Sequence, residues 1–173
     1  MIKPLVYSLL LLLPRAAAAV EDKPEVIAKT KAEEIAQATL KGDCEKILDL
    51  THPEIVRIGG GRVRMLEAMK RVMEQIKAKG FEFQSAKIGD KVQLAAVADK
   101  RYAVIPLTLE MKTPDGLLTA SSFLLGISPD KGKTWTFING DKAHDPAVKN
   151  LLSDLPPSLK LPERKQPVFK PNK

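Results

Sequence analysis

Cysteine and histidine are scarce in this chain of 173 residues, and their scarcity excludes several kinds of site. Cys44 is the only cysteine, so no internal disulfide and no metal site built from several cysteines can form. A lone cysteine is either a reactive thiol or a small buried side chain, and its helical surroundings favour burial. The only histidines, His52 and His144, lie far apart in the sequence, and no third ligand accompanies them. We therefore expect no metal and no cofactor.

Aromatic residues and clustered charge are also sparse. Phe, Trp and Tyr make up 5% of the chain. The formal net charge is +7, but the basic residues are scattered and do not alternate with aromatic residues. The pattern is typical of a solvated basic surface, and nucleic acid is not an expected partner.

The first nineteen residues predict a signal peptide. Lys3 gives a positive start, Leu5–Leu13 is an apolar run, and Ala16–Ala19 supply the small residues that a signal peptidase reads. The apolar run has about half the length of a membrane span. We expect cleavage near Ala19–Val20 and export to the periplasm or the extracellular space, with no membrane contact afterwards. A retained N-terminal anchor is the alternative.

Residues 20–145 predict one domain in which helices precede strands. Apolar residues recur at helical spacing in three stretches, and Pro, Gly and Asp residues mark their ends. The expected helices are Val20–Lys41, Cys44–Leu50 and Arg62–Lys79, with a short strand at Glu54–Ile58.

The second half of this domain predicts an antiparallel meander. Two turn signals, Thr113–Gly116 and Ser128–Lys133, separate long apolar runs, and such short loops join strands as hairpins. The upstream helices are expected to cover one face of the sheet. The expected strands are Phe81–Ile88, Val92–Ala98, Tyr102–Met111, Leu117–Ile127 and Thr134–Ile138.

Residues 146–173 predict a proline-rich tail. Ala147–Leu152 can form a short helix, and Pro156–Lys173 holds five of the thirteen prolines. Few core-forming residues accompany these prolines, so we expect an extended segment, either free or docked on the domain, and not a second domain.

The order of elements over Val26–Ala143 resembles the nuclear transport factor 2-like superfamily, also called the SnoaL-like or cystatin-like cone. Four stretches carry the resemblance: Leu40–Asp43, His52-Pro53, Gly59–Arg62 and Trp135–Gly140. The resemblance implies an α+β fold in which a strongly bent sheet wraps the helices and leaves a conical pocket. Members include ketosteroid isomerase-like and dehydratase-like enzymes and also non-catalytic binding or dimerising modules, so the fold does not fix the function.

The expected core follows from the apolar side of each element. Its members are Ile35, Leu48, Leu66, Met69, Val72, Phe83, Leu94, Ile105, Leu107, Phe123, Leu125, Trp135 and Phe137.

Two glycine-containing motifs are interpreted as structural. Ser128–Trp135 resembles the Asp-box, S-x-D-x-G-x-T-W, of sialidases and other exported β proteins, and a single copy predicts a hairpin turn with Trp135 packed beneath it. Gly59–Arg62 could cradle an anion at a helix start, but a flexible turn explains the glycines without a ligand.

The candidate catalytic residues are His52, Asp141 and His144. His52 precedes a proline, where capping is the structural alternative. Asp141 and His144 could form a carboxylate–histidine pair or simply be solvated. Ketosteroid isomerase chemistry also needs a tyrosine and a protonated carboxyl group. Tyr102 is the only tyrosine after export, and no strand carries an acidic residue on a clearly apolar face, so the catalytic set is incomplete.

The candidate ligand contacts are Asn139, Tyr102 and Ser121. A period of two places Asn139 on the face of Trp135 and Phe137, nearest the expected pocket. We expect an exported, non-catalytic module that binds a small apolar molecule or a protein partner through the cone and the outer sheet face. The alternatives are an isomerase or dehydratase acting in the cone and a structural domain that forms a homodimer through the sheet.

Overall fold

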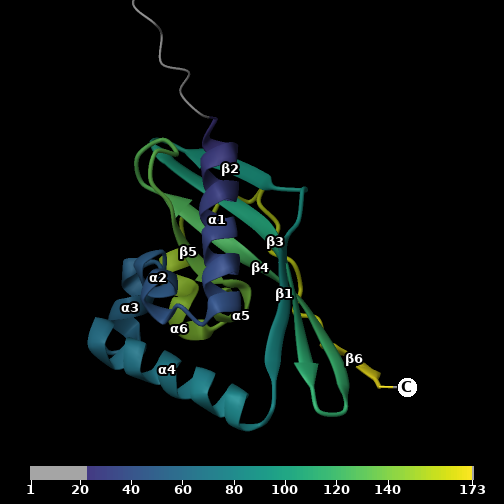
Figure 1. The fold of residues 1–173 in the computed structure, drawn as a ribbon. Coiled ribbons are helices and arrows are strands. Elements are labelled where there is room, and N and C mark those ends of the chain that lie inside the picture. Colours follow the sequence, from purple (N-terminus) through teal and green to yellow (C-terminus); the bar gives the residue numbers. More distant parts are fainter. Residues whose placement is uncertain (1–22, 173) are drawn as a thin grey trace, which may run out of the picture.

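This computed structural model describes residues 23–172, apart from the side chain of Lys149. The expected signal peptide and its cleavage site lie outside the described residues. The described chain has an α+β fold: helices come first, and a six-stranded antiparallel sheet that does not close on itself follows (Figure 1). The elements are α1 (Pro24–Lys41), α2 (Cys44–Asp49), α3 (Pro53–Ile58), α4 (Arg62–Ala78), β1 (Glu82–Ile88), β2 (Gln93–Val97), β3 (Lys100–Thr113), β4 (Gly116–Ser128), β5 (Thr136–Asn139), α5 (Gly140–Ala143), α6 (Pro146–Lys149), the 3₁₀ turn η1 (Asn150–Leu152) and β6 (Val168–Pro171).

The β3–β4 hairpin is the centre of the sheet, and it confirms the predicted meander. Its register runs from Arg101 opposite Ser128 to Thr113 opposite Gly116. The hydroxyl of Thr113 closes the turn, because it donates to the carbonyl oxygen of Gly116 and accepts from the backbone N–H of the same residue, both at 3.1 Å. β2 and β1 pair with the other edge of β3, and β5 and β6 pair with the other edge of β4.

The inner face of the sheet is the face that α1 covers (Figure 1). Ala28, Ala32 and Ala36 recur along α1 and are almost completely buried, so the small side chains let the helix lie close to the strands. The cluster on this face also contains Ile35, Leu50, Ala103, Ile105, Leu107, Leu124, Trp135 and Phe137.

The outer face carries a second buried cluster, which the sequence interpretation did not foresee. α5 and the C-terminal segment (residues 146–172) pass over this face. The cluster contains Ile55, Tyr102, Val104, Phe123, Leu125, Ile127, Ile138, Ala143, Val148 and Leu159. α1 therefore covers one face, and the chain that follows the sheet, together with Ile55 of α3, covers part of the other.

The predicted core is correct in its larger part. Phe123 and Leu125 are buried as expected, but they lie opposite Pro106 and Val104 on the outer face, away from Ile105 and Leu107. Leu66, Met69 and Phe83 are only half-buried. Val72 and Leu94 are wrong as core residues, since they are 52% and 40% exposed. α4 packs mainly on α2 and α3, and α1 packs mainly on β1, α2 and β3.

The predicted strand at Glu54–Ile58 is wrong, because the residues form α3. Pro53 occupies the first turn, where its fixed φ suits a helix and its missing N–H costs nothing. The extended backbone lies just before it instead. Thr51 forms a parallel bridge with Phe137, and the backbone N–H of His52 donates to the carbonyl oxygen of Phe137 at 2.9 Å.

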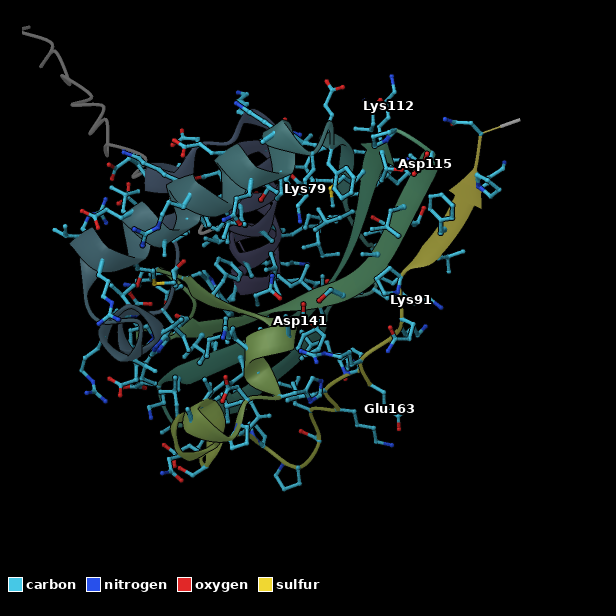
Figure 2. All side chains as sticks on the ribbon, turned by 90° about the horizontal axis from the view of Figure 1, so that it is seen from below. Lys79, Lys91, Lys112, Asp115, Asp141 and Glu163 are labelled. Carbon is cyan, nitrogen blue, oxygen red and sulfur yellow. The ribbon has the colours of Figure 1, made fainter. Side chains whose placement is uncertain are left out.

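From residue 156 on, the C-terminal segment contains no helix, in keeping with the predicted extended tail, and it is docked on the domain. The side chain of Gln93 bonds both backbone groups of Lys160, at 3.2 and 3.3 Å. The unpredicted β6 then pairs with the start of β4, beside the hairpin tip that carries Asp115 (Figure 2). The predicted helix at Ala147–Leu152 corresponds to α6 and η1.

None of the helices in the described part of the chain is long and apolar enough to cross a membrane.

Candidate functional site

A pocket of about 380 Å³ opens where the outer face of the sheet meets α3 and η1. This volume lies within the range of about 300–1,000 Å³ that is usual for small-molecule sites. Its walls come from four separate parts of the chain, which only the fold brings together. The lining residues are His52, Pro53, Lys100, Tyr102, Ile127, Pro129, Thr134, Thr136 and Leu151.

Three neighbouring strands form the floor of this pocket. Tyr102 on β3 lies opposite Ile127 on β4, and Ile127 lies opposite Thr136 on β5. Directly paired residues share one face of a sheet, so these three side chains form one row across the outer face. Tyr102 is 3% exposed and Ile127 is 8% exposed, which shows that the floor is packed in place without a ligand.

His52 stands on one wall because it caps α3. Its Nδ1 accepts the backbone N–H of Glu54 at 3.2 Å, so the neutral ring carries its proton on Nε2. Burial lowers the pKa of His52 from its ordinary value, and the charge of Glu54 opposes this shift. At neutral pH the side chain is therefore an uncharged hydrogen-bond donor beside an apolar floor.

Lys100 supplies the charge at the rim. Its Nζ lies 2.9 Å from Oδ2 of Asp154 in the C-terminal segment. This hydrogen bond holds the pKa of Lys100 above its ordinary value, and the neighbouring Tyr102 acts in the same direction. The ion pair fastens the C-terminal segment close to Leu151, which forms the opposite wall. Both partners are about half-exposed, so the pair contributes little to folding stability.

A second hollow of about 570 Å³ continues the pocket along α3. The two hollows share His52, Pro53 and Leu151, so they form one groove between α3 and the C-terminal segment. Arg57 and Glu54 line the second hollow and form an ion pair with each other. The groove is thus apolar at the sheet and charged at its outer end.

His144 and Asp141, the other catalytic candidates, bind different partners. Nε2 of His144 donates to the carbonyl oxygen of Pro162 at 3.0 Å. Asp141 accepts from Nε of Arg164 at 3.1 Å. Figure 2 labels Asp141 on α5 and Glu163 on the C-terminal segment that passes this helix. Both candidates hold that segment in place, away from the pocket that His52 lines.

Of the three predicted ligand contacts, only Tyr102 lines the pocket. Asn139 lies opposite Leu124 on the inner face, and its side chain accepts the N–H of Asp141 at 3.0 Å, capping α5. Ser121 is exposed and lies opposite Thr108, farther along β4. Asn139 shares the inner face with Phe137, as the period of two predicts, but the pocket that His52 lines lies on the outer face, so Asn139 does not line it.

The Asp-box turn is a hairpin device, as predicted, and it shapes one wall. Asp130 accepts from the backbone N–H of Thr134 at 2.9 Å and from its hydroxyl at 2.8 Å. These bonds lower the pKa of Asp130 from 3.8 to about 2. Trp135 is 3% exposed and donates its indole N–H to the carbonyl oxygen of Gly132 at 2.9 Å. The fixed turn places Pro129 and Thr134 against the pocket.

Two further candidates have a structural explanation. Gly60 and Gly61 both have φ of +88°, which favours glycine, so the turn before α4 accounts for them on backbone grounds. Cys44 is 5% exposed and lies in α2, as expected for a small buried side chain.

The sequence interpretation missed Lys100, Leu151 and Thr136 as pocket residues. Thr136 could have been found, because the period of two places it beside Ile138 on one face of β5. Leu151 carried no such signal, since its position depends on how the C-terminal segment folds back.

The arrangement suits the binding of a small molecule. Tyr102, Ile127, Leu151 and the two prolines supply apolar surface, and His52, Lys100 and the threonines supply hydrogen-bonding groups. Among the described residues that line the pocket, none is a carboxylate. No group of three or more His, Cys, Asp or Glu side chains in residues 23–172 is placed to hold a metal ion. Comparison of the chain with protein-family models, with curated proteins and with solved structures gave no match.

Proposed function

We propose that this protein is a non-catalytic binding module for a small, mainly apolar molecule that carries one anionic or hydrogen-bond-accepting group. The observation that carries this proposal is the pocket of about 380 Å³, with a buried apolar floor and with His52 and Lys100 at its edge. Recognition sites for small molecules usually combine apolar surface with a few polar groups in this way.

The packed floor supports binding because it requires little rearrangement. Tyr102 and Ile127 are held by both strand pairing and the outer cluster, so little side-chain freedom remains to be lost. The N–H of a neutral His52 and the ammonium group of Lys100 are both donors, which favours a ligand with a carboxylate, sulfonate or carbonyl group.

Catalysis of the isomerase or dehydratase type is the alternative. It needs a base and a partner that stabilises the developing oxyanion, and His52 and Tyr102 are the two candidates that line one pocket. A proton-transfer site of the ketosteroid isomerase type also uses a carboxyl group, and the lining residues do not offer one. Binding therefore explains more of the site than proton transfer does.

The proposal also covers the cone-like fold, the export of the protein and its oligomeric state. We infer a cone of the nuclear transport factor 2-like type, supported by the order of helices and by the long antiparallel strands whose inner face α1 covers. The apolar run and small residues before residue 20 support export. A homodimer through the outer sheet face is less favoured, because the protein's own C-terminal segment covers part of that face.

A fluorescent probe tests the proposal directly. Anilinonaphthalene sulfonate is aromatic and carries one sulfonate, so its fluorescence should rise when it binds the pocket. Thr136→Trp fills the pocket and should weaken probe binding by about tenfold or more. Thr108→Trp is the matched control: Thr108 is also a half-buried threonine on the outer face, but it does not line the pocket.

The proposal fails if both tryptophan variants bind the probe as the unmodified protein does. Native mass spectrometry of the purified protein adds a second measurement, since a co-purified small molecule should be lost in the Thr136→Trp variant and kept in the Thr108→Trp variant.

A further inference from the structure

A second pocket, of about 190 Å³, lies on the other side of the molecule, between the end of α1, the end of α4 and the start of β1. It shares no residue with the pocket at His52. Its walls are Thr39, Leu40, Lys41, Gly42, Met73, Ile76, Lys77, Phe81, Glu82 and Phe83.

α4 has an apolar stripe, and two of its residues, Met73 and Ile76, line this pocket. Leu66, Met69, Met73 and Ile76 follow one another at helical spacing, so they lie on one side of the helix. None of the residues of α4, all of which the structure describes, is buried. The stripe lies outside both buried clusters described above. It is half-buried, which leaves apolar surface in partial contact with water.

The lining suggests a flexible chain as the occupant. Methionine is unbranched and polarizable, so Met73 can adapt to an irregular aliphatic surface, and Phe81 and Phe83 add broad apolar faces. The volume is below the range of about 300–1,000 Å³ that is usual for a whole drug-sized ligand, so the pocket fits part of a ligand. A narrow aliphatic chain fits these limits better than a fused ring system.

The rim determines the charge of the occupant. Lys41 and Lys77 are exposed side chains at the edge of the pocket, and Glu82 is the one acidic residue among the lining residues. Two ammonium groups against one carboxylate favour an anionic head group at the mouth.

We propose that this pocket binds the aliphatic chain of an anionic amphiphile with its head group beside Lys41 and Lys77. A second copy of the chain is a poorer occupant, because a stable dimer buries about 800 Å² on each partner and this concavity is narrow. The site is independent of the function proposed for the pocket at His52.

Decanoate, below its micelle concentration, is the probe, and isothermal titration calorimetry is the measurement. Decanoate should bind, decanol should bind more weakly, and decylammonium should bind least, because the chain is the same and only the head group changes. Lys77→Glu should weaken decanoate binding by about tenfold or more. Lys70→Glu is the control. Lys70 lies about two helical turns before Lys77 on α4, carries the same charge and does not line the pocket.

A second pair of variants tests the chain-binding wall. Met73→Glu places a carboxylate in the apolar pocket and should also weaken binding by about tenfold or more, whereas Gln75→Glu on the exposed side of α4 should have little effect. Thermal melting and the fluorescence of Trp135 report whether each variant is folded.

Three results would overturn the proposal: no binding of decanoate, equal binding of decanoate and decylammonium, or equal losses in the Lys77 and Lys70 variants. Dimerisation that Met73→Glu abolishes, without decanoate binding, would assign the groove to a second copy and reject the amphiphile. Decanoate that displaces anilinonaphthalene sulfonate and is blocked by Thr136→Trp would place it in the other pocket, which also contradicts this site.

Discussion

The two halves of the β3–β4 hairpin differ in how many of their faces are buried. In the half near α5, residues 102–105 of β3 and 123–128 of β4 are buried without interruption. In the half near the hairpin tip, residues 108–112 of β3 and 117–121 of β4 are half-buried or exposed. α1 and Leu50 cover the first half on one side, and Ile55 of α3, α5 and the C-terminal segment cover it on the other.

The sequence pattern of β3 changes between the two halves and accounts for this difference in burial. Tyr102–Leu107 is a continuous apolar run, whereas Thr108–Thr113 alternates polar and apolar side chains. Continuous apolar runs are typical of strands that are buried on both faces. Alternation of polar and apolar residues is typical of strands with one solvent-exposed face. One strand thus passes from a doubly covered to a singly covered environment, and its pattern changes at the same place.

Two leucines on β4, one in each half of the hairpin, give the largest expected contrast in stability. Leu125 and Leu117 both lie on the outer face, but Leu125 is completely buried and Leu117 is only half-buried. Leu125→Ala should lower the free energy of unfolding by about 2–5 kcal/mol, and Leu117→Ala by about 1 kcal/mol or less. Urea denaturation measures both. Equal losses would show that the two halves are not differently packed.

The C-terminal segment gives the next contrast. Leu159 is 6% exposed within the outer cluster, and Val168 in β6 is 68% exposed. Leu159→Ala should destabilise the protein by about 2–4 kcal/mol, since a buried leucine is truncated, and Val168→Ala should change stability by less than about 0.5 kcal/mol. If Leu159→Ala has no larger effect in thermal or urea unfolding, the outer face does not depend on this segment.

Gly116→Ala probes the hairpin tip with a smaller, local effect. A Cβ at this position would lie 2.2 Å from the carbonyl oxygen of Lys170 and 2.8 Å from Cα of Pro171, so β6 has to move. We expect faster hydrogen exchange in residues 168–171 with little change in global stability. Ser121→Ala, which lies outside the pairing with β6, is the control. A cooperative loss of the whole fold would contradict the separation of the two halves.

Acid sensitivity of the Asp130 turn gives the smallest expected effect. The bonds to Thr134 lower the pKa of Asp130 to about 2. The stability that the ionised carboxylate adds to the fold is therefore fully present above the ordinary pKa near 3.8. The contribution is lost as pH falls from about 4 to about 2. Asp130→Asn should flatten the pH dependence of unfolding in this window, and Thr134→Val should do so in part. Unchanged pH profiles would show that these bonds do not couple to folding.

Much of the fold could be predicted from local sequence signals. Gly42, Asp43 and Gly80 marked helix ends, and the Thr113–Gly116 turn set the register of the central hairpin. Glu54–Ile58 was misassigned because a short apolar run suits either a helix or a strand, and Pro53 at the first turn decided for the helix.

The site was less predictable because distant parts of the chain build it. His52 and Tyr102 were recognised singly by their chemistry, but their shared pocket follows from strand pairing and from the position of η1. Leu151 lies 49 positions after Tyr102, and no periodicity connects them. The alternation of faces placed Asn139 correctly beside Phe137 on the inner face, but it could not show that the pocket lies on the outer face.

The position of Leu151 makes the pocket and the C-terminal segment thermodynamically linked. The same stretch of chain forms a wall of the pocket, carries Asp154 to Lys100, and continues into the leucines that cover the outer cluster. A ligand that contacts Leu151 must therefore stabilise the docked segment. Undocking of the segment must weaken the binding of the ligand by the same free energy. Protection of the C-terminus from a carboxypeptidase becomes a measure of pocket occupancy that requires no labelled ligand.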